Sequence, residues 1–207
     1  MVRAGRRLHI AAGAVGLLGA ILLVGAVAFI VTECKAVIAA SRAMEPTYRP
    51  GQYVLLQRVS PGQVRRGKVV LYQEPDRYQG KSVLQRVIGV GGDQIMDRPG
   101  HPLTVNGKPL AEPYVKYGDP SAGTGPYKVV VPPGRLFLLG DNRADSFDCR
   151  YFLNDAYSGT IPTTAVQAQV NDDPKGFLAP VMTGVFGLLL ILAALGLGIA
   201  ARITRNG

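Results

Sequence analysis

The chain has 207 residues, of which 47% are hydrophobic and 18% charged, and its formal net charge is +9. This length suits about one domain together with membrane anchors. A protein that binds nucleic acid usually has basic residues clustered on one face. Here the basic residues are spread along the chain and mostly interspersed with acidic ones, so we expect no nucleic-acid partner. The cysteines, Cys34 and Cys149, form no Cys/His cluster. We therefore expect no metal site and no cofactor.

Two long apolar blocks, His9 to Val31 and Phe177 to Ala201, account for the high hydrophobic content. Each is long enough for a membrane-spanning helix, which needs about 20 apolar residues, and neither contains a formal charge. The first block exceeds the apolar region of a cleavable signal peptide, about 7–15 residues, so we expect an uncleaved anchor. We predict transmembrane helices over residues 9–32 and 176–201, flanking an extracytoplasmic domain over residues 33–175.

Arginines lie outside both predicted spans, in short tails over residues 1–8 and 202–207. These arginines are Arg3, Arg6, Arg7, Arg202 and Arg205. By the positive-inside rule, both tails are cytoplasmic. The sequence therefore predicts a two-pass membrane protein with both termini in the cytoplasm and the central domain outside.

Between the spans, short β-strand patterns alternate with Gly and Pro turns. A short extended segment is expected over 32–40, and runs rich in β-branched and aromatic residues predict strands at 53–59, 68–72, 82–88, 127–131, 135–139, 161 and 165–170. Asn106-Gly107 between short apolar runs predicts a hairpin over 103–110. Residues 111–127, rich in Gly, Pro and Tyr, predict an irregular loop. The expected fold class is mostly β: an all-β extracytoplasmic domain flanked by two transmembrane helices.

The predicted domain opens with Ser41-Arg-Ala-Met-Glu-Pro-Thr47. This stretch resembles the nucleophile motif of type I signal peptidases, which reads Ser-x-Ser-Met-x-Pro-Thr. Ser41, Met44, Pro46 and Thr47 match that motif. The residue before the methionine is the nucleophilic serine in that family, and here it is Ala43, whose methyl group cannot attack a carbonyl carbon.

A second stretch, Gln85-Arg-Val-Ile-Gly-Val-Gly-Gly-Asp93, is similar to the family motif Lys-Arg-x-x-Gly-x-Pro-Gly-Asp. The family's lysine serves as the general base, kept neutral by burial. Gln85 replaces this lysine, and Gly91 replaces the proline. The matching residues are Arg86, Gly89, Gly92 and Asp93.

A third stretch, Gly140-Asp-Asn-Arg-Ala-Asp-Ser-Phe-Asp-Cys-Arg150, resembles the family motif Gly-Asp-Asn-Arg-x-x-Ser-x-Asp-Ser-Arg. Cys149 stands for a serine, and the matching residues are Gly140, Asp141, Asn142, Arg143, Ser146, Asp148 and Arg150. Three motifs in order, together spanning most of residues 41–150, imply a signal-peptidase-like fold.

The resemblance also implies roles. Ser41 matches a position whose hydroxyl helps to hold the developing oxyanion. Ser146 and Asp148 match positions that orient the lysine and its neighbours. We expect the remaining motif residues to hold the fold, and these are Met44, Pro46, Arg86, Asp141, Arg143 and Arg150.

Because both positions of the Ser/Lys dyad are substituted, at Ala43 and Gln85, the sequence predicts a pseudoenzyme of the bacterial plasma membrane. It would bind the signal peptides of exported proteins with cleavage impaired, and its further partners would be the lipid bilayer, an active paralogue or the secretion machinery. An active signal peptidase I, an engineered inactive form of one, and a β-scaffold with no peptide role are the alternatives. The natural codons at these two positions would identify an engineered form.

An active form would need substitute chemistry. Ser41 and Cys149 are the candidate nucleophiles, and Lys81 is the candidate base. His101 follows Pro99-Gly100 and is expected in an exposed loop, which disfavours a Ser-His-Asp triad. Whether Cys34 and Cys149 form a disulfide stays open at this point.

Overall fold

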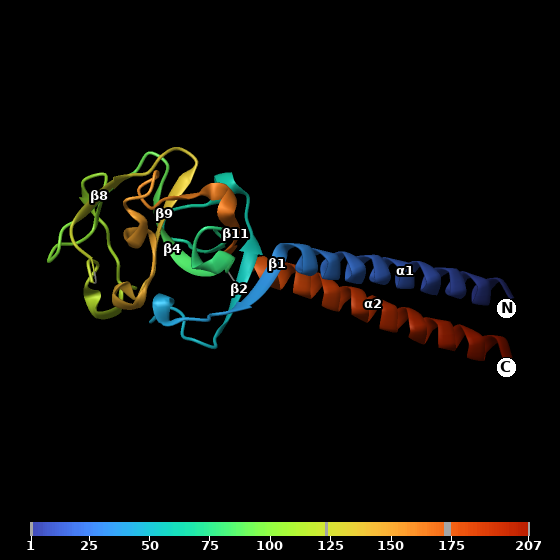
Figure 1. Ribbon diagram of the computed structural model, residues 1–207. Helices are drawn as coiled ribbons and strands as arrows, with labels where there is room; N and C mark the ends of the chain where they lie inside the picture. The colour runs from blue at the N-terminus through green and yellow to red at the C-terminus, as the bar shows by residue number, and fades with distance from the viewer. Residues whose placement is uncertain (1, 123, 172–174, 207) are drawn as a thin grey trace. The chain divides into compact units, whose positions relative to one another are not determined.

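The computed structural model describes residues 2–122, 124–171 and 175–206. It contains two compact units (Figure 1). One is helical and consists of the chain up to Cys34 and from Asn171 onward, and the other, Lys35–Val170, is built mainly of strands.

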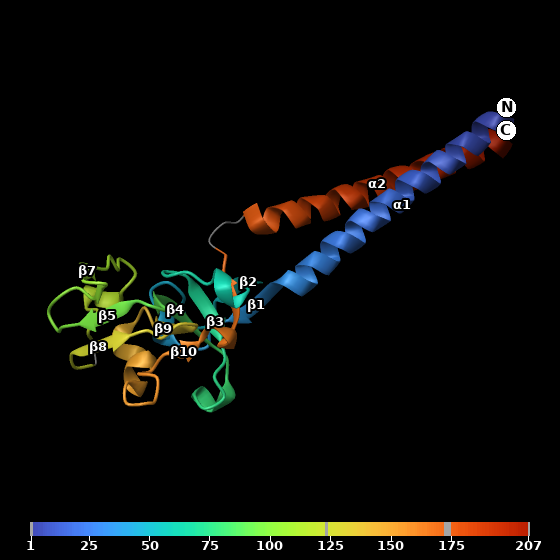
Figure 2. The ribbon, with the colours of Figure 1, turned by 90° about the horizontal axis from the view of Figure 1, so that it is seen from above.

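The helical unit pairs α1, Val2–Glu33, with α2, Lys175–Asn206. The helices lie side by side, with both chain ends at the same end of the pair (Figures 1 and 2). The segments Leu8–Glu33 and Gly176–Ile203 are long and apolar enough to cross a membrane. Both helices run beyond the predicted spans, so most of the predicted tails is helical. Met1, residues 172–174, Gly207 and the side chains of Arg3, Arg6, Arg7 and Arg205 lie outside the described parts.

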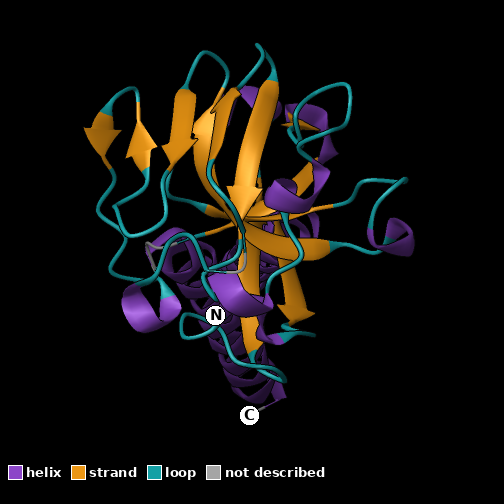
Figure 3. Cartoon of the chain, turned by 60° about the vertical axis from the view of Figure 1, so that its left-hand side comes forward, coloured by secondary structure: helices purple, strands orange, loops and turns teal. Residues whose placement is uncertain are grey.

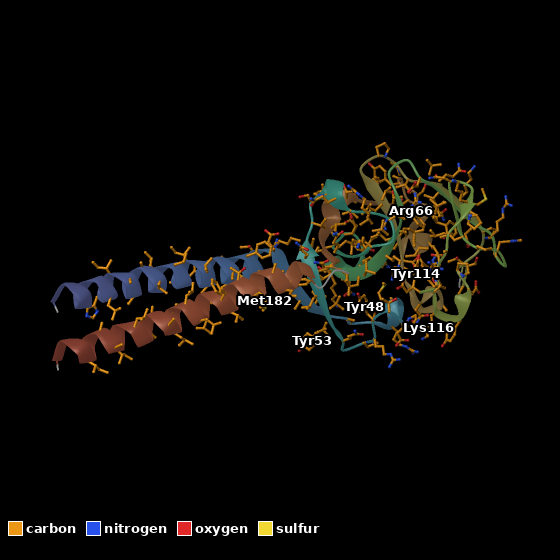
Figure 4. The ribbon with its side chains drawn as sticks, turned by 180° about the vertical axis from the view of Figure 1, so that it is seen from behind. Tyr48, Tyr53, Arg66, Tyr114, Lys116 and Met182 are labelled. Carbon is orange, nitrogen blue, oxygen red and sulfur yellow. The ribbon has the colours of Figure 1, made fainter. Side chains whose placement is uncertain are left out.

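Small residues form the contact between α1 and α2. A Cβ added to Gly19 would lie 2.6 Å from the carbonyl oxygen of Gly187, and one added to Gly187 would lie 2.7 Å from the carbonyl oxygen of Gly19. Ala12 and Ala201 are buried in the unit. Large apolar side chains such as Met182 are exposed instead (Figure 4). Close backbone approach through small residues is typical of helices that pair in a membrane.

The β unit contains two antiparallel sheets connected by short loops and 3₁₀ turns (Figure 3). The larger has the strand order β1-β2-β11-β3-β4-β9-β10 and the smaller β7-β6-β5-β8. The strands are β1 Cys34–Ile38, β2 Tyr53–Arg58, β3 Val69–Tyr72, β4 Val83–Val90, β5 Gln94–Asp97, β6 Thr104–Val105, β7 Lys108–Pro109, β8 Tyr127–Val130, β9 Arg135–Leu139, β10 Ile161–Pro162 and β11 Val166–Val170. The 3₁₀ helices are η1 Arg42–Met44, η2 Pro61–Gln63, η3 Tyr78–Gly80, η4 Lys116–Gly118, η5 Arg143–Asp145, η6 Cys149–Phe152 and η7 Thr163–Ala165.

The predicted strands are present, and so is the predicted hairpin. Its turn residues Asn106 and Gly107 have φ of 55° and 76°, as a two-residue type I′ turn requires. The strand β5 was not predicted, and β4 continues through Val90 instead of stopping at Gly89. Cys34 and Cys149 are free thiols, so the structure has no disulfide between them.

Two apolar clusters stabilise the β unit. The larger packs residues of both sheets, including Ile88, Ile95 and Phe137. The smaller contains Leu56, Leu71 and other strand residues, and Met44 of the first motif packs into it with 3% of its surface exposed. The second cluster therefore anchors the motif loop to the larger sheet, because a buried Met side chain stabilises by roughly 1.5–3 kcal/mol.

Candidate functional site

The first and third motifs are joined by hydrogen bonds from Asn142 to two backbone carbonyls. The turn η1 carries Ala43, and Ser41 caps it by accepting from the Ala43 N–H at 3.4 Å. Asn142 N–H donates to the Ala43 carbonyl at 2.9 Å, and Asn142 Nδ2 donates to the Arg42 carbonyl at 3.1 Å. Ala43 is thus held from both sides, and its position is set by the fold rather than by its own small side chain.

Asp141 joins all three motifs. Arg86 donates to both of its carboxylate oxygens, at 2.8 and 2.6 Å, and the Thr47 hydroxyl donates to Oδ2. The guanidinium of Arg86 lies 3.9 Å from the ring centre of Tyr114, which belongs to the same loop as Lys116 (Figure 4). A bidentate, buried Arg–carboxylate pair of this kind fixes geometry strongly. Asp141 and Arg86 therefore hold the site together.

Arg143, Asp148 and Arg150 form a second buried network. Arg150 donates through Nε and Nη2 to the two oxygens of Asp148, at 2.8 and 2.9 Å, and the Gly140 N–H donates to Asp148 at 3.2 Å. Arg143 donates to the Gly140 carbonyl and pairs with Glu112. The oxygens of Asp148 are therefore occupied by this network.

Ser146 is the exception among the buried motif residues. It is only 3% exposed, yet its hydroxyl finds no hydrogen-bond partner among the described residues. Gly140 makes room for it, since a Cβ on Gly140 would lie 2.2 Å from Ser146 Oγ and 2.6 Å from the Ala43 carbonyl oxygen. A buried hydroxyl without a hydrogen bond lowers the stability of the fold by about 1–3 kcal/mol. Ser146 is therefore a destabilising residue at this position unless its hydroxyl gains a partner.

Gln85 lies on β4 with 2% of its surface exposed, and both polar atoms of its amide have hydrogen-bond partners. Nε2 donates to the Phe147 carbonyl at 3.1 Å, and Oε1 accepts from the Tyr72 hydroxyl at 2.8 Å. The Tyr78 hydroxyl also donates to the Phe147 carbonyl, at 3.0 Å. Gln85 thus connects β4, β3 and the third motif. A glutamine amide takes up no proton at neutral pH, so this side chain is not a base.

The other ionisable groups around Gln85 are also poor catalysts. Burial raises the pKa of the Tyr72 hydroxyl well above its ordinary value, and it raises the pKa of Tyr78 to about 12. Burial likewise raises the pKa of the Cys149 thiol to about 12. These groups stay protonated at neutral pH, and a nucleophilic cysteine would need the opposite shift. Cys149 is therefore a buried structural thiol.

A groove of about 420 Å³ runs beside Ala43 and Gln85. Its lining includes Val37–Ser41, Lys81–Gln85 and Phe147. In the described part of the chain, β1 pairs only with β2. Residues 83–85 of β4 pair with β3 along one edge. Along its other edge, β4 pairs with β9 only from Arg86 onward, so residues 83–85 have no partner strand on that side. Two strand edges without a partner strand therefore border this groove.

The alternative catalytic candidates are placed as follows. Ser41 and Lys81 both line the groove and are exposed. His101 is exposed, as predicted, and lines a separate hollow of about 510 Å³ with Glu112 and Asp119. That hollow contains none of the residues of the three motifs.

Sequence reasoning missed Tyr72, Tyr78 and Phe147, which come from separate segments and meet only through tertiary pairing. It also missed the ion pair between Lys116 and Glu45, at 2.6 Å, which ties η4 to the first motif. Of these residues, Phe147 and Glu45 lie inside motifs, each at a position where the motif specifies no residue type.

Comparison with known proteins assigns the family. The family model described as "Signal peptidase, peptidase S26" matches residues 12–171. The chain belongs to this signal peptidase family. The fold is accordingly a signal-peptidase-like β domain with terminal helices apolar enough to span a membrane.

Individual relatives agree. The chain is 39% identical over 104 residues to a probable signal peptidase I of Mycobacterium leprae (strain TN), an alignment covering 41% of this chain and 36% of that protein. It is 37% identical over 123 residues to signal peptidase I V of Bacillus subtilis (strain 168), covering 53% and 71%. The chain therefore spans little more than a third of the length of the mycobacterial relative.

A crystal structure of a signal peptidase I from Enterococcus faecalis V583 is also similar. It shares 25% sequence identity with this chain, has a TM-score of 0.42, and the match covers 53% of this chain and 97% of that one.

Proposed function

We propose that this chain is a membrane-anchored signal peptidase I-like protein that binds signal peptides of exported proteins without cleaving them. Ala43 and Gln85 stand where the resembled motifs place the nucleophile and the general base. The observation that supports the loss of cleavage best is the environment of Gln85, whose amide is used at both ends to hold Tyr72 and the Phe147 carbonyl. A serine nucleophile needs a base beside it, and the amide of Gln85 cannot act as one.

Peptide binding is supported by the groove. An extended peptide can add to an exposed strand edge through backbone hydrogen bonds, with pockets for alternate side chains. Here two such edges, on β1 and on β4, border the same groove. The proposal places the peptide as an added strand between them, with small side chains facing the lining near Ala39 and Ala43.

The same proposal includes the membrane setting. The chain would lie in the bacterial plasma membrane, with both termini cytoplasmic and the β unit outside. An active paralogue or the secretion machinery would then share the signal peptides that it binds.

The test uses the full chain in detergent with a precursor that carries Ala at the first and third positions before the cleavage site. We expect the labelled precursor to bind, by fluorescence anisotropy, and to remain uncut. Ile38→Glu should weaken binding at least about tenfold, since it places a charge on the exposed edge strand beside the groove. Val130→Glu is the matched control, because Val130 is also an exposed β-branched strand residue, at 58% against 53%, and lies on β8 in the other sheet.

Cleavage at that site, lost in a Ser41→Ala variant, would instead show a working peptidase that uses Ser41. An uncut precursor that binds the Ile38→Glu and Val130→Glu variants equally well would mean that the groove is not the binding site.

A further inference from the structure

An aromatic surface adjoins the groove. It consists of Tyr78, Phe147, Tyr151 and Phe152, which we call the aromatic shelf. Phe147 contacts the other three, with ring centres 6.1, 4.7 and 5.1 Å away respectively. Phe147 and Tyr78 also line the groove, so the shelf and the groove are continuous.

The local backbone explains why Phe147 faces outward. Ser146 and Asp148 both have extended backbone dihedrals and buried side chains. Side chains alternate between the two sides of an extended segment, so Phe147 lies on the opposite side from its buried neighbours. Its ring is 54% exposed, and the ring of Tyr151 is 48% exposed.

The shelf is held firmly although its outer surface is exposed. The Phe147 carbonyl accepts two hydrogen bonds, from Tyr78 and Gln85. Beneath the shelf, the Arg77 guanidinium lies 4.0 Å from the ring centre of Phe152 and is itself fixed by Asp155 and the Gly159 carbonyl. Aromatic rings that are held in place lose little conformational entropy when a ligand packs on them.

A chain that occupies the groove would lie next to the shelf, because Phe147 and Tyr78 belong to both. Exposed, contiguous apolar surface at the mouth of a binding groove is typical of an interaction site. Offset-stacked and edge-to-face ring pairs favour an aromatic ligand beyond the area that they bury.

We propose that the aromatic shelf is a specificity site for an aromatic or large aliphatic side chain of the bound peptide. That side chain would lie within three residues of the small residue opposite Ala43. This inference rests on the proposed peptide binding in the groove, and it adds a second recognition element next to the small-residue pockets.

The test compares peptides that differ at one position. Each fluorescent peptide keeps Ala at the two positions proposed to enter the small-residue pockets. One of the other positions within three residues of the Ala opposite Ala43 carries either Phe or Ser, and these positions are tested one at a time. Binding to the full chain is measured by anisotropy, in detergent and in bilayer nanodiscs, with empty micelles and nanodiscs as blanks. We expect one position at which Phe binds about tenfold more tightly than Ser.

The protein variants decide where the preference arises. Phe147→Ser should abolish the difference in affinity between the two peptides. Tyr157→Ser should keep the difference, since Tyr157 is also 54% exposed but stacks on Arg135 and does not line the groove. Circular dichroism checks that both variants are folded.

Each other outcome overturns the inference in a distinguishable way. Equal binding of Phe and Ser peptides leaves peptide binding intact and removes the shelf's role. A preference that survives in Phe147→Ser comes from another surface. A preference seen in detergent and lost in nanodiscs would mean that lipid covers the shelf. Absence of binding by every peptide would overturn the proposed function together with the inference.

Discussion

The polar side chains of Gln85 and Ser146, both at motif positions, differ in whether they have hydrogen-bond partners. The amide of Gln85 satisfies the Phe147 carbonyl and the Tyr72 hydroxyl, while Ser146 Oγ is buried without a partner. A neutral lysine amine at position 85 could donate to the Phe147 carbonyl and still meet a second acceptor. The unused hydroxyl of Ser146 is chemically suited to be that acceptor.

A double substitution tests whether the surroundings still support catalysis. Ala43→Ser combined with Gln85→Lys should cleave the precursor about 100-fold faster than either single variant, because nucleophile and base act as a unit. The reaction is followed by gel electrophoresis of the precursor and by mass spectrometry of the product ends. The single variants are the controls, and folding is checked by near-ultraviolet circular dichroism.

A folded double variant with no cleavage would contradict this prediction. It would mean that the departures at Gly91 and Cys149 have changed the site as well. Gly91 packs closely on the Pro132–Gly134 turn, since an added Cβ would lie 3.0 Å from Pro133 Cα. The backbone there follows a path that suits glycine.

The turn between β4 and β5 depends on the Asp93 carboxylate. Burial alone would raise its pKa, but hydrogen bonds from the Val90 N–H, Arg66 and Asn106 outweigh burial and hold the pKa below its ordinary value. A carboxyl with a lowered pKa in the folded state contributes stability above its unfolded pKa, near 3.9, and loses it as the pH falls through the folded value.

We therefore expect Asp93→Asn to destabilise the β unit at pH 7 by about 1–3 kcal/mol. The difference from the unaltered protein should shrink as the pH falls below about 4. Urea unfolding followed by tyrosine near-ultraviolet circular dichroism measures this, because the 9 tyrosines all belong to the β unit and there is no tryptophan. Asp76→Asn, in an exposed loop, is the control. A difference that stays constant down to pH 3 would contradict the assigned role.

The pairing of α1 and α2 depends on Gly19 and Gly187, because each lies against the backbone of the other helix. Gly19→Leu should separate the helices, whereas Gly13→Leu should not, since an added Cβ at Gly13 meets nothing within 4 Å. The pairing can be followed in a protein that carries both Gly16→Cys and Ala194→Cys, in which a disulfide forms when the helices pack together. The geometry suits a disulfide, because a Cβ on Gly16 would lie 3.3 Å from that of Ala194.

We expect the cross-linked fraction in a bilayer to fall several-fold with Gly19→Leu and to be unchanged with Gly13→Leu. Proteolysis of the β unit before a non-reducing gel separates linked from unlinked helices. Cys34→Ser removes a competing thiol. Equal cross-linking in the two leucine variants would rule out close packing at Gly19.

The sequence predicted those helices, strands and turns that depend on the pattern of neighbouring residues. The apolar blocks, the Asn106-Gly107 hairpin and the β-branched runs needed no knowledge of partners. β5 was missed because Gln94–Asp97 is short and half polar, and its pairing with β6 and β8 depends on distant segments. Gly89 was expected to end β4, but the strand continues through it. The glycine instead makes room for Ile95 of β5, since an added Cβ at Gly89 would lie 2.6 Å from the Ile95 side chain.

The candidate site was predicted in part for the same reason. The motifs identified Ala43 and Gln85 as the residues at the two dyad positions. The contacts of Gln85 with Tyr72 and the Phe147 carbonyl could not be predicted, because they combine β3, β4 and the third motif. Tyr78 adds a positive φ of 52°, which no residue pattern indicates for a tyrosine.

The orientation of the chain in the membrane is the last prediction. The arginines near both chain ends favour cytoplasmic termini, and the β unit must then be outside. Arg98→Cys, at an exposed position of the β unit, should react with a membrane-impermeant maleimide in intact spheroplasts. Ala4→Cys and Asn206→Cys should react only after permeabilisation. Cys34→Ser provides the background, and Cys149 is too buried to react in the folded protein.

Labelling of both terminal cysteines in intact spheroplasts, with Arg98→Cys protected, would invert the orientation. The β unit would then lie in the cytoplasm, where exported proteins still carry their complete leader. Reaction of only one terminal cysteine would mean that one helix does not cross the bilayer. The inverted orientation would remove the basis for binding signal peptides on the outer side, because the groove could then meet them only before export.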